Sequence, residues 1–418
     1  MNKNIACIIL AAGKGERMKS ETPKVLHTIC GRPMINYVLD LVDELKISNS
    51  VVVLGHKHEE VKKAIGSRVR TVIQKKLVGT ADAVKQALSA LSSFKGTVLI
   101  LYGDIPLLKK DTIRKLIDSH TKNKSDLTVL TAEVDKPSGY GRIKRDKFVS
   151  ICGIVEEKDA NEYEKLIKEI NTGIICFDKN KLAQVIKQIK PNNRKKEYYL
   201  TDAIKIFYDK GYFVEGVKIA DVEEAMGANS RVDLAKAAKV MQGRINLELM
   251  NSGVTIIDPS TAIINFGTKI GKDTIIYPFT VVDNSVKIGK HCFIGPFAHL
   301  RDGTTICDNV VVGNFLEIVR SKISSETFVK HFSYIGDSNV GRGVNIGAGT
   351  VTANFDGKNK HNTVIKDGAF IGSDSVLIAP VKVGRRAVVA AGSVVLRNTF
   401  VRDGKAVAGV PAKLIKRH

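Results

Sequence analysis

The sequence predicts two domains of different architecture, an α/β domain followed by a parallel β-helix of hexapeptide repeats. In the first half of the chain, short apolar runs alternate with helical segments, which is the pattern of a sheet with crossover helices on both faces. In the last third, an aliphatic residue recurs at every sixth position. The predicted domains are residues 1–228 and 251–418, and residues 229–250 are predicted to form a linker helix.

The alternation in the first half defines individual elements. Predicted strands are 5–10, 51–54, 69–74 and 97–101, and predicted helices are 33–45, 59–65 and 80–91. Ligands of such sheets bind beyond the carboxyl ends of the strands. The stretch from Leu10 to Lys24 follows the first predicted strand and Tyr102-Gly103-Asp104 follows the fourth, so both are candidate binding segments.

The stretch from Leu10 to Lys24 is a Gly-rich turn suited to a polyphosphate. Gly13 and Gly15 lack a Cβ, so backbone N–H groups there can approach phosphate oxygens closely. Arg17 and Lys24 add two cations. The turn lacks the third glycine of a dinucleotide fingerprint, and it does not have the spacing of a P-loop. Taken alone, these residues also fit an ordinary surface turn.

Asp104 is a candidate metal ligand because it ends a buried strand. A carboxylate in that position is costly unless it has a partner, and Mg²⁺ bridging phosphates is a suitable one. The alternative is that Asp104 caps the N-terminus of the following helix.

Composition limits the other possibilities. The chain carries 65 Lys and Arg against 43 Asp and Glu, for a net charge of +22, with +13 in residues 1–250 and +9 in 251–418. This even excess indicates no nucleic-acid-binding tail, and the absence of Trp argues against a base-stacking platform. We therefore expect no nucleic-acid partner and interpret the charge as suited to anionic small-molecule substrates.

Cysteine usage and hydropathy favour a cytoplasmic protein. The six cysteines are scattered without a C-x-x-C pair, which favours reduced thiols over disulfides or zinc. The first four residues lead directly into an apolar strand, so we expect no signal peptide. No apolar run approaches membrane-spanning length, and we expect no membrane span.

The string L-A-A-G-x-G-x-R-M…P-K between Leu10 and Lys24 resembles the signature of the sugar nucleotidylyltransferases, which join a sugar 1-phosphate to a nucleotide. Further segments follow in that family's order. They are Gln74 with Gly79-Thr80, 139–143, 156–159, 171–173, 197–202 and 227–231. Together they resemble the bifunctional N-acetylglucosamine-1-phosphate uridylyltransferase/glucosamine-1-phosphate N-acetyltransferases, which implies a Rossmann-like nucleotidyltransferase fold for the first domain.

This resemblance implies roles for residues of the first domain. Arg17 and Lys24 would act on the triphosphate of UTP, and Asp104 and Asn229 would hold Mg²⁺. The other implied contacts to UTP or the UDP-sugar are Leu10, Ala11, Gly13, Gln74, Gly79, Thr80, Tyr102, Gly141, Glu156 and Asn171. Of these, Gln74, Gly79 and Thr80 would face uracil, and Gly141, Glu156 and Asn171 would contact the acetylated sugar. Two residues near the base depart from the family, since Leu77 stands for a usual Gln and Asp82 for a usual His.

The six-residue period of the last third runs through 270, 276, 282, 288, 294, 300, 306, 312 and 318, and it resumes through 365, 371, 377, 383, 389 and 395. It indicates three short strands per coil. It resembles the left-handed β-helix acyltransferases, which generally form trimers that bind acyl-CoA between neighbours. The resemblance implies a homotrimer.

The hexads are irregular around His331. Ile323 follows Ile318, and Val340 follows Ile335, after five residues where the period predicts six. A loop then interrupts the pattern at 354–363. Such breaks are expected at functional sites. We expect the bulky His331 ring to be unfavourable in a regular coil, and a histidine can accept a proton near neutral pH from an amine that attacks a thioester.

The resemblance implies that His331 is the catalytic base of acetyl transfer. It assigns Arg301, Tyr334, Asn345, Asn354 and Lys360 to the amino-sugar phosphate, and Ala348, Ser373 and Ala391 to acetyl-CoA. This half also departs from the family. Val319 stands for a phosphate-binding Lys, with Arg320 adjacent, Phe355 for a Tyr, and Gly409 for an Arg, and the early β-helix is shorter than is common.

The predicted function is UDP-N-acetylglucosamine synthesis in two steps, which contributes to cell-wall biogenesis. Acetyl-CoA first acetylates glucosamine 1-phosphate, and UTP with Mg²⁺ then uridylylates N-acetylglucosamine 1-phosphate and releases pyrophosphate. One alternative is a monofunctional sugar-1-phosphate nucleotidylyltransferase whose β-helix only trimerises or acetylates another amino sugar. Another is a cationic binding protein on an enzyme scaffold, which would bind nucleic acid in a salt-dependent manner without turnover.

Overall fold

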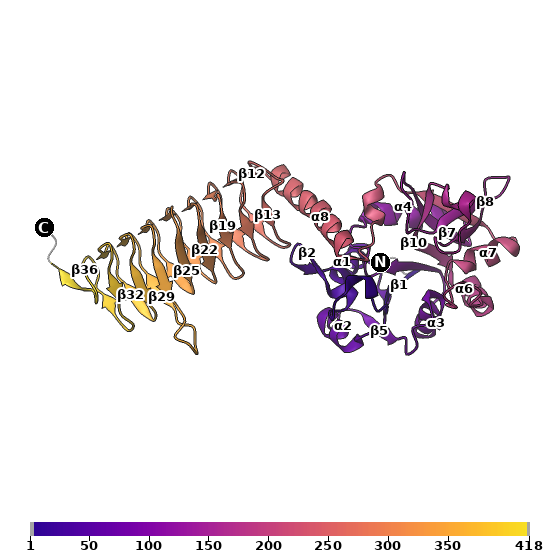
Figure 1. The fold of residues 1–418 in the computed structure, drawn as a ribbon, viewed down its shortest axis with the longest axis horizontal. Helices are drawn as coiled ribbons and strands as arrows, with labels where there is room; N and C mark the ends of the chain where they lie inside the picture. The colour runs from indigo at the N-terminus through magenta and orange to yellow at the C-terminus, as the bar shows by residue number, and fades with distance from the viewer. Residues whose placement is uncertain (1–3, 416–418) are drawn as a thin grey trace. The chain divides into compact units, whose positions relative to one another are not determined.

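The chain forms two compact units that divide between Val240 and Met241 (Figure 1). The computed structural model describes residues 4–415. Helix α8 (Arg231–Asn251) begins in the first unit and ends in the second. Within residues 4–415, no helix combines the length and the apolar character needed to cross a membrane.

The first unit is built on a nine-stranded sheet with the order β11-β7-β10-β6-β1-β4-β5, to which the β8–β9 hairpin is attached through β10. Its strands are β1 (Ile5–Ala11), β4 (Asn49–Leu54), β5 (Arg70–Ile73), β6 (Thr97–Tyr102), β7 (Leu127–Glu133), β8 (Arg142–Arg145), β9 (Ile151–Val155), β10 (Glu169–Asp178) and β11 (Val214–Lys218). A separate ribbon pairs β2 (Thr28–Ile29) with β3 (Arg32–Pro33).

Helices cover both faces of this sheet, as the sequence predicted. They are α1 (Met34–Glu44), α2 (His58–Ile65), α3 (Thr80–Ala90), α4 (Lys110–Lys122), α5 (Glu162–Lys165), α6 (Lys179–Val185) and α7 (Asp202–Asp209), with 3₁₀ turns η1 (Glu16–Met18), η2 (Lys24–Leu26), η3 (Ile186–Gln188) and η4 (Val222–Ala225). Alternate residues of buried β1 face opposite sides. Cys7 and Ile9 join a core with α1, α2 and α4, whereas Ile8 and Leu10 join a core with α3, α6 and α7.

Strand β10 runs antiparallel to both of its neighbours, β6 and β7, which the sequence pattern did not indicate. An apolar run shows that a strand is buried but does not show its direction. The pairing of β10 with β7 shifts register between Asn171 and Ile175. Gly173, inside that irregularity, has a left-handed φ of 84°. The shift therefore marks one of the segments assigned to the sugar.

The second unit is a parallel β-helix of three sheets. The first sheet holds β12 (Thr255–Ile256), β15 (Ile275–Ile276), β18 (Phe293–Ile294), β21 (Val311–Val312), β24 (Phe328–Val329), β27 (Asn345–Ile346), β30 (Phe370–Ile371), β33 (Val388–Val389), β36 (Ala406–Ala408) and antiparallel β37 (Lys413–Ile415). The second holds β13 (Ile263–Ile264), β16 (Val281–Val282), β19 (Ala298–Leu300), β22 (Leu316–Val319), β25 (Ser333–Gly336), β28 (Val351–Ala353), β31 (Val376–Ile378) and β34 (Val394–Val395). The third holds β14 (Lys269–Ile270), β17 (Lys287–Ile288), β20 (Thr305–Ile306), β23 (Lys322–Ile323), β26 (Ser338–Val340), β29 (Thr363–Ile365), β32 (Val381–Val383) and β35 (Phe400–Val401).

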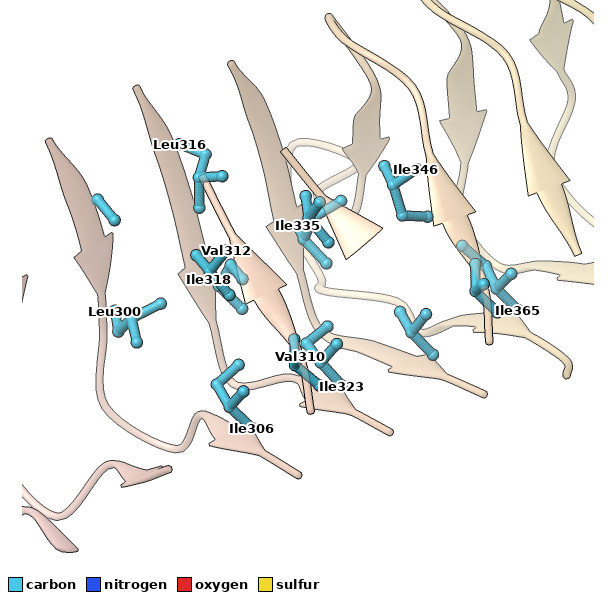
Figure 2. Close-up of a cluster of buried hydrophobic side chains, with 14 of the residues drawn as sticks. Leu300, Ile306, Val310, Val312, Leu316, Ile318, Ile323, Ile335, Ile346 and Ile365 are labelled. Carbon is cyan, nitrogen blue, oxygen red and sulfur yellow. The ribbon is translucent and has the colours of Figure 1, made fainter. Parts of the chain in front are cut away.

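The hexad residues form the core of this β-helix. Ile276 pairs with Ile294, and Ile294 with Val312, so equivalent residues stack one coil apart. Figure 2 shows aliphatic side chains of successive coils gathered in the interior. The predicted left-handed β-helix of hexapeptide repeats is therefore the architecture of this unit.

The irregular hexads keep their pairing. Ile306 pairs with Ile323 and Ile318 with Ile335, and both inward residues of each pair remain buried. The shortened coils thus lose a residue from a turn and not from a strand. The loop that follows β28 closes on itself through an antiparallel bridge between Phe355 and Lys360.

Candidate functional site

The two glycines of the first turn have different roles. Gly15 has a left-handed φ of 67°, and a Cβ there would lie 2.6 Å from Cβ of Lys24. Gly15 is therefore required for the path of the chain and for the placement of Lys24. A Cβ at Gly13 would meet nothing within 4 Å, so this position is open to a ligand.

Lys24 connects two side-chain oxygens that are far apart in sequence. Its Nζ forms an ion pair with the carboxylate of Asp104 and donates a hydrogen bond to Asn229 Oδ1 at 3.0 Å. The backbone N–H of Ala228 donates to the Asp104 carbonyl at 3.0 Å, which brings the segment before α8 to the end of β6. Two side-chain oxygens thus converge on a single cation. Helix α4 begins at Lys110, so Asp104 is not its N-cap.

This oxygen pair fits Mg²⁺. Mg²⁺ prefers hard oxygen ligands and usually takes one or two from protein, with the remainder from water and substrate phosphates. Asp104 is 8% exposed, so its carboxylate needs a compensating cation. Within residues 4–415, no cluster of three or more His, Cys, Asp or Glu side chains could hold a metal without substrate.

Arg17 supplies a second cation on the same Gly-rich turn as Lys24. It lies exposed on η1, and its side chain makes no hydrogen bond or ion pair with any residue between 4 and 415. Arg231 holds the same turn in place, because its Nε donates to the Met18 carbonyl at 3.2 Å. The Arg17 guanidinium is therefore available to an anion.

The segment implied to read the base is braced from two sides. Gln74 is 4% exposed, and its Nε2 donates to the Gly79 carbonyl at 3.0 Å and to Asp82 Oδ2 at 2.9 Å. Gly79 has a φ of 125°, and a Cβ there would lie 2.4 Å from the Tyr198 carbonyl oxygen. Thr80 Oγ1 accepts a hydrogen bond from Leu200 N–H at 3.0 Å.

Leu77, one of the departures from the family, has a packing role. A Cβ at Gly55 would lie 2.6 Å from Leu77 Cδ2, and Leu77 packs against the core that contains Leu10. Its side chain therefore covers part of the apolar core that contains Leu10.

The residues assigned to the sugar lie close to one another. The Asn171 N–H donates to the Gly141 carbonyl at 2.8 Å, and a Cβ at Gly141 would meet Glu156 Oε2 at 3.3 Å. Burial raises the pKa of Glu156, although Thr201 Oγ1 donates to its Oε1 at 3.1 Å. Burial thus favours the neutral form of this carboxyl group more than an exposed position would.

Tyr102, at the end of β6, lies next to residues of all of these segments. Burial raises the pKa of its phenol, the charges of Glu156 and Asp104 raise it further, and a hydrogen bond with Thr80 opposes them. The Gly103 N–H donates to the Leu10 carbonyl at 2.9 Å, which joins the two strand ends. The Gly-rich turn (10–24), the base loop (74–80) and the residues assigned to the sugar (141, 156 and 171) are therefore neighbours at the carboxyl ends of these strands.

A second polar cluster lies on the β-helix around Asp337. Arg320 donates to this carboxylate from Nε at 2.6 Å and from Nη2 at 2.8 Å. Asn354 donates to the same carboxylate and to the Tyr334 hydroxyl, the latter at 3.4 Å. The pKa of Asp337 is lowered by Arg320 first, with a smaller contribution from the Lys360 charge.

Arg301 lies near this Asp337 cluster and pairs with Glu317, from Nη1 to Oε1 at 2.7 Å. Val319 is 2% exposed, so it offers no contact to a phosphate. Arg320 and Asp337 were not among the predicted site residues. Arg320 had been noted only as a neighbour of Val319, and the sequence around Asp337 carries no signal beyond the broken hexads.

His331 lies exposed in the turn between β24 and β25, and its ring makes no hydrogen bond with any residue of 4–415. The expectation that its ring would be unfavourable in the coil is wrong, because the side chain faces solvent and displaces no core residue. No hydrogen bond or ion pair within the described chain joins His331 or the Asn345 side chain to the Asp337 cluster.

The three residues assigned to acetyl-CoA occupy one corner of the β-helix. They follow β27, β30 and β33 in successive coils. The Asp374 N–H donates to the Ala348 carbonyl at 2.6 Å, and the Gly392 N–H to the Ser373 carbonyl at 2.7 Å. The corner is a column of small residues, with Ser373 and Ala391 exposed.

Comparisons with known proteins agree with this architecture. Residues 7–164 match the MobA-like NTP transferase domain, and residues 267–301, 285–320 and 362–397 match the six-repeat bacterial transferase hexapeptide. The chain is 44% identical to the bifunctional protein GlmU of Shouchella clausii, over 93% of each chain. It is 43% identical to that of a Geobacillus species, over 93% of this chain and 92% of the relative, and 41% identical to that of Clostridioides difficile, over 99% and 96%.

Proposed function

The chain belongs to the family of bifunctional GlmU proteins, and we propose that it makes UDP-N-acetylglucosamine in two steps. Acetyl-CoA acetylates glucosamine 1-phosphate, and UTP then uridylylates the product. The observation that carries the proposal is that Lys24, Asp104 and Asn229 converge in a nucleotidyltransferase domain joined to a hexapeptide β-helix in one chain.

In uridylyl transfer, a phosphate oxygen of N-acetylglucosamine 1-phosphate forms a bond to the α-phosphorus of UTP. The bond from that phosphorus to the bridging oxygen breaks, and pyrophosphate leaves with the electron pair. Asp104 and Asn229 would hold Mg²⁺, which when bound neutralises phosphate charge. Arg17 binds the triphosphate, and Lys24 turns from Asp104 toward the phosphates. Positioning and charge neutralisation account for most of the catalysis, so no general base is needed.

In acetyl transfer, His331 accepts a proton from the amine of glucosamine 1-phosphate. The nitrogen forms a bond to the thioester carbonyl carbon, the C–S bond breaks, and coenzyme A leaves as a thiolate that takes up a proton. The exposed, unpaired His331 ring supports this role. The cations Arg301, Arg320 and Lys360 supply positive charge for the acceptor phosphate near Tyr334.

The β-helix is proposed to assemble as a homotrimer that binds acetyl-CoA along the small-residue corner of Ala348, Ser373 and Ala391. An exposed aromatic ladder on the same unit supports assembly. Phe279 stacks on Phe297 and Phe297 on Phe315, with ring centroids 5.1 and 4.9 Å apart. We place both reactions in the cytoplasm, in keeping with six free cysteine thiols.

An assay of both half-reactions on the purified chain tests this function. We expect acetyl-CoA-dependent acetylation of glucosamine 1-phosphate and Mg²⁺-dependent formation of UDP-N-acetylglucosamine from UTP. Uridylyl transfer without acetylation would leave a monofunctional nucleotidylyltransferase, and acetylation of a different amino sugar would reassign the acceptor. Neither activity, with salt-dependent nucleic-acid binding, would support a cationic binding protein.

A further inference from the structure

We propose that Asp82 is a positioning residue that fixes the orientation of the Gln74 amide and thereby makes the base loop select a base with a carbonyl beside an N–H. The inference rests on the proposed use of UTP. Asp82 is one of the residues at which this chain departs from the family, and the structure gives it a specific contact with Gln74.

The contact determines which way the amide points. Both acceptors of Gln74 Nε2, the Gly79 carbonyl and the Asp82 carboxylate, lie within 3.0 Å of it. A carbonyl and an ionised carboxylate accept hydrogen bonds and donate none, so the amide nitrogen and not its oxygen must face them. Turning the amide over would place its oxygen against two acceptors inside a buried site. The Asp82 carboxylate and the Gly79 carbonyl therefore both make the reversed orientation of the Gln74 amide unfavourable.

This orientation leaves one hydrogen-bond acceptor and one donor of the base loop without a partner among the described residues. Within residues 4–415, Gln74 Oε1 accepts no hydrogen bond and the Gly79 N–H donates none. One acceptor and one donor are thus presented by neighbouring parts of the loop, since the Gln74 amide already contacts the Gly79 peptide.

Gln74 Oε1 as acceptor and the Gly79 N–H as donor discriminate between uracil and cytosine. In uracil, N3–H can donate to Gln74 Oε1 while O4 accepts from the Gly79 N–H. Cytosine presents the reverse, a bare N3 acceptor and an exocyclic amino donor. Binding cytosine on this edge requires the Gln74 amide to turn over, which the two acceptors oppose. The structure thus predicts a preference for UTP over CTP that depends on Asp82.

A purely structural role for Asp82 predicts something else. The residue lies in the first turn of α3, where a negative charge favours the helix, and its Oδ1 accepts from Gln86 Nε2 at 3.3 Å. If that were its whole contribution, replacing it would lower the melting temperature and weaken UTP and CTP binding equally. The ratio of the two dissociation constants separates the roles.

The test measures Kd for UTP and CTP by calorimetry on the full chain with Mg²⁺, for wild type, Asp82→Leu, Asp82→Ala and Asp82→Asn. We expect both apolar variants to lower the ratio of Kd for CTP to Kd for UTP by about tenfold, because one of the two acceptors that hold the amide is lost. Asp82→Asn should keep the ratio within about twofold, since its side-chain oxygen also accepts. The control Gln86→Leu, which removes only the helix contact, should leave the ratio unchanged.

A double-mutant cycle completes the test. In a Gln74→Leu background, Asp82→Leu should no longer change the ratio, because the amide it orients is absent. An unchanged ratio in folded Asp82→Leu and Asp82→Ala, or a wild type without preference for UTP, would overturn the inference. Tight, selective UTP binding without formation of UDP-sugar would instead overturn the proposed function, so the two failures are distinguishable.

Discussion

Replacing Lys24 with Met should weaken catalysis while tightening the binding of Mg²⁺ to the free enzyme. Lys24 Nζ occupies the space between Asp104 and Asn229, so a metal must displace it. A charge-assisted hydrogen bond contributes about 1.5–3 kcal/mol, and its removal should raise Mg²⁺ affinity by at least about tenfold. Loss of one preorganised cation should lower kcat of uridylyl transfer by about 10²–10³.

Calorimetric titration of nucleotide-free protein with Mg²⁺, together with steady-state kinetics, measures both effects. The melting temperature of Lys24→Met should fall in metal-free buffer and recover with Mg²⁺, because the buried Asp104 carboxylate regains a cation. Lys181→Met is a matched control, since Lys181 forms a partly buried pair with Asp126, which precedes the amino end of β7, and should affect stability without Mg²⁺ rescue. Unchanged or weaker Mg²⁺ affinity in Lys24→Met would refute the shared site.

Three further predictions concern the acetyl half, the sugar side and assembly. His331→Ala should lower kcat of acetyl transfer by about 10²–10⁴ with coenzyme affinity unchanged, and a wild-type kcat would make it a surface residue. Burial raises the pKa of Glu156 in the folded chain above its pKa in the unfolded chain. Ionisation of Glu156 therefore lowers the free energy of unfolding as the pH rises from the unfolded-state pKa through the folded-state pKa. Glu156→Gln should therefore melt higher than wild type at pH 8, with a difference that shrinks toward about pH 4, and a pH-independent difference would contradict this. Light scattering should show a trimer at micromolar concentration. A monomer that is active in acetyl transfer would contradict the proposed trimer.

The repeating elements were predictable because their period is a direct consequence of burial. Ile276, Ile294 and Val312 recur at fixed spacing since each fills the same position in successive coils. The first strand, predicted over 5–10 and observed as Ile5–Ala11, was equally clear, because every residue of β1 is buried. The direction of β10 was not predictable, since an apolar run does not show whether a strand is parallel or antiparallel to its neighbours.

The contacts within the sites were less predictable than their members. Family resemblance pointed to Lys24, Asp104 and Asn229, but their convergence on one cation depends on the fold, across 80 and 205 residues of sequence. Asp82 was visible only as a departure from the family, and its bond to Gln74 required the loop geometry. The argument that the His331 ring is unfavourable in the coil failed because a broken period does not show which way a side chain points.

The most direct test of a bifunctional enzyme is a one-pot reaction of glucosamine 1-phosphate, acetyl-CoA and UTP with Mg²⁺, followed by mass spectrometry. Wild type should form UDP-N-acetylglucosamine. Arg17→Ala should accumulate N-acetylglucosamine 1-phosphate, because it weakens only the nucleotide site, whereas His331→Ala should form the UDP-sugar only when N-acetylglucosamine 1-phosphate is supplied. Equal loss of both activities in either folded variant, or no acetylated product from wild type, would contradict two separate sites in one chain.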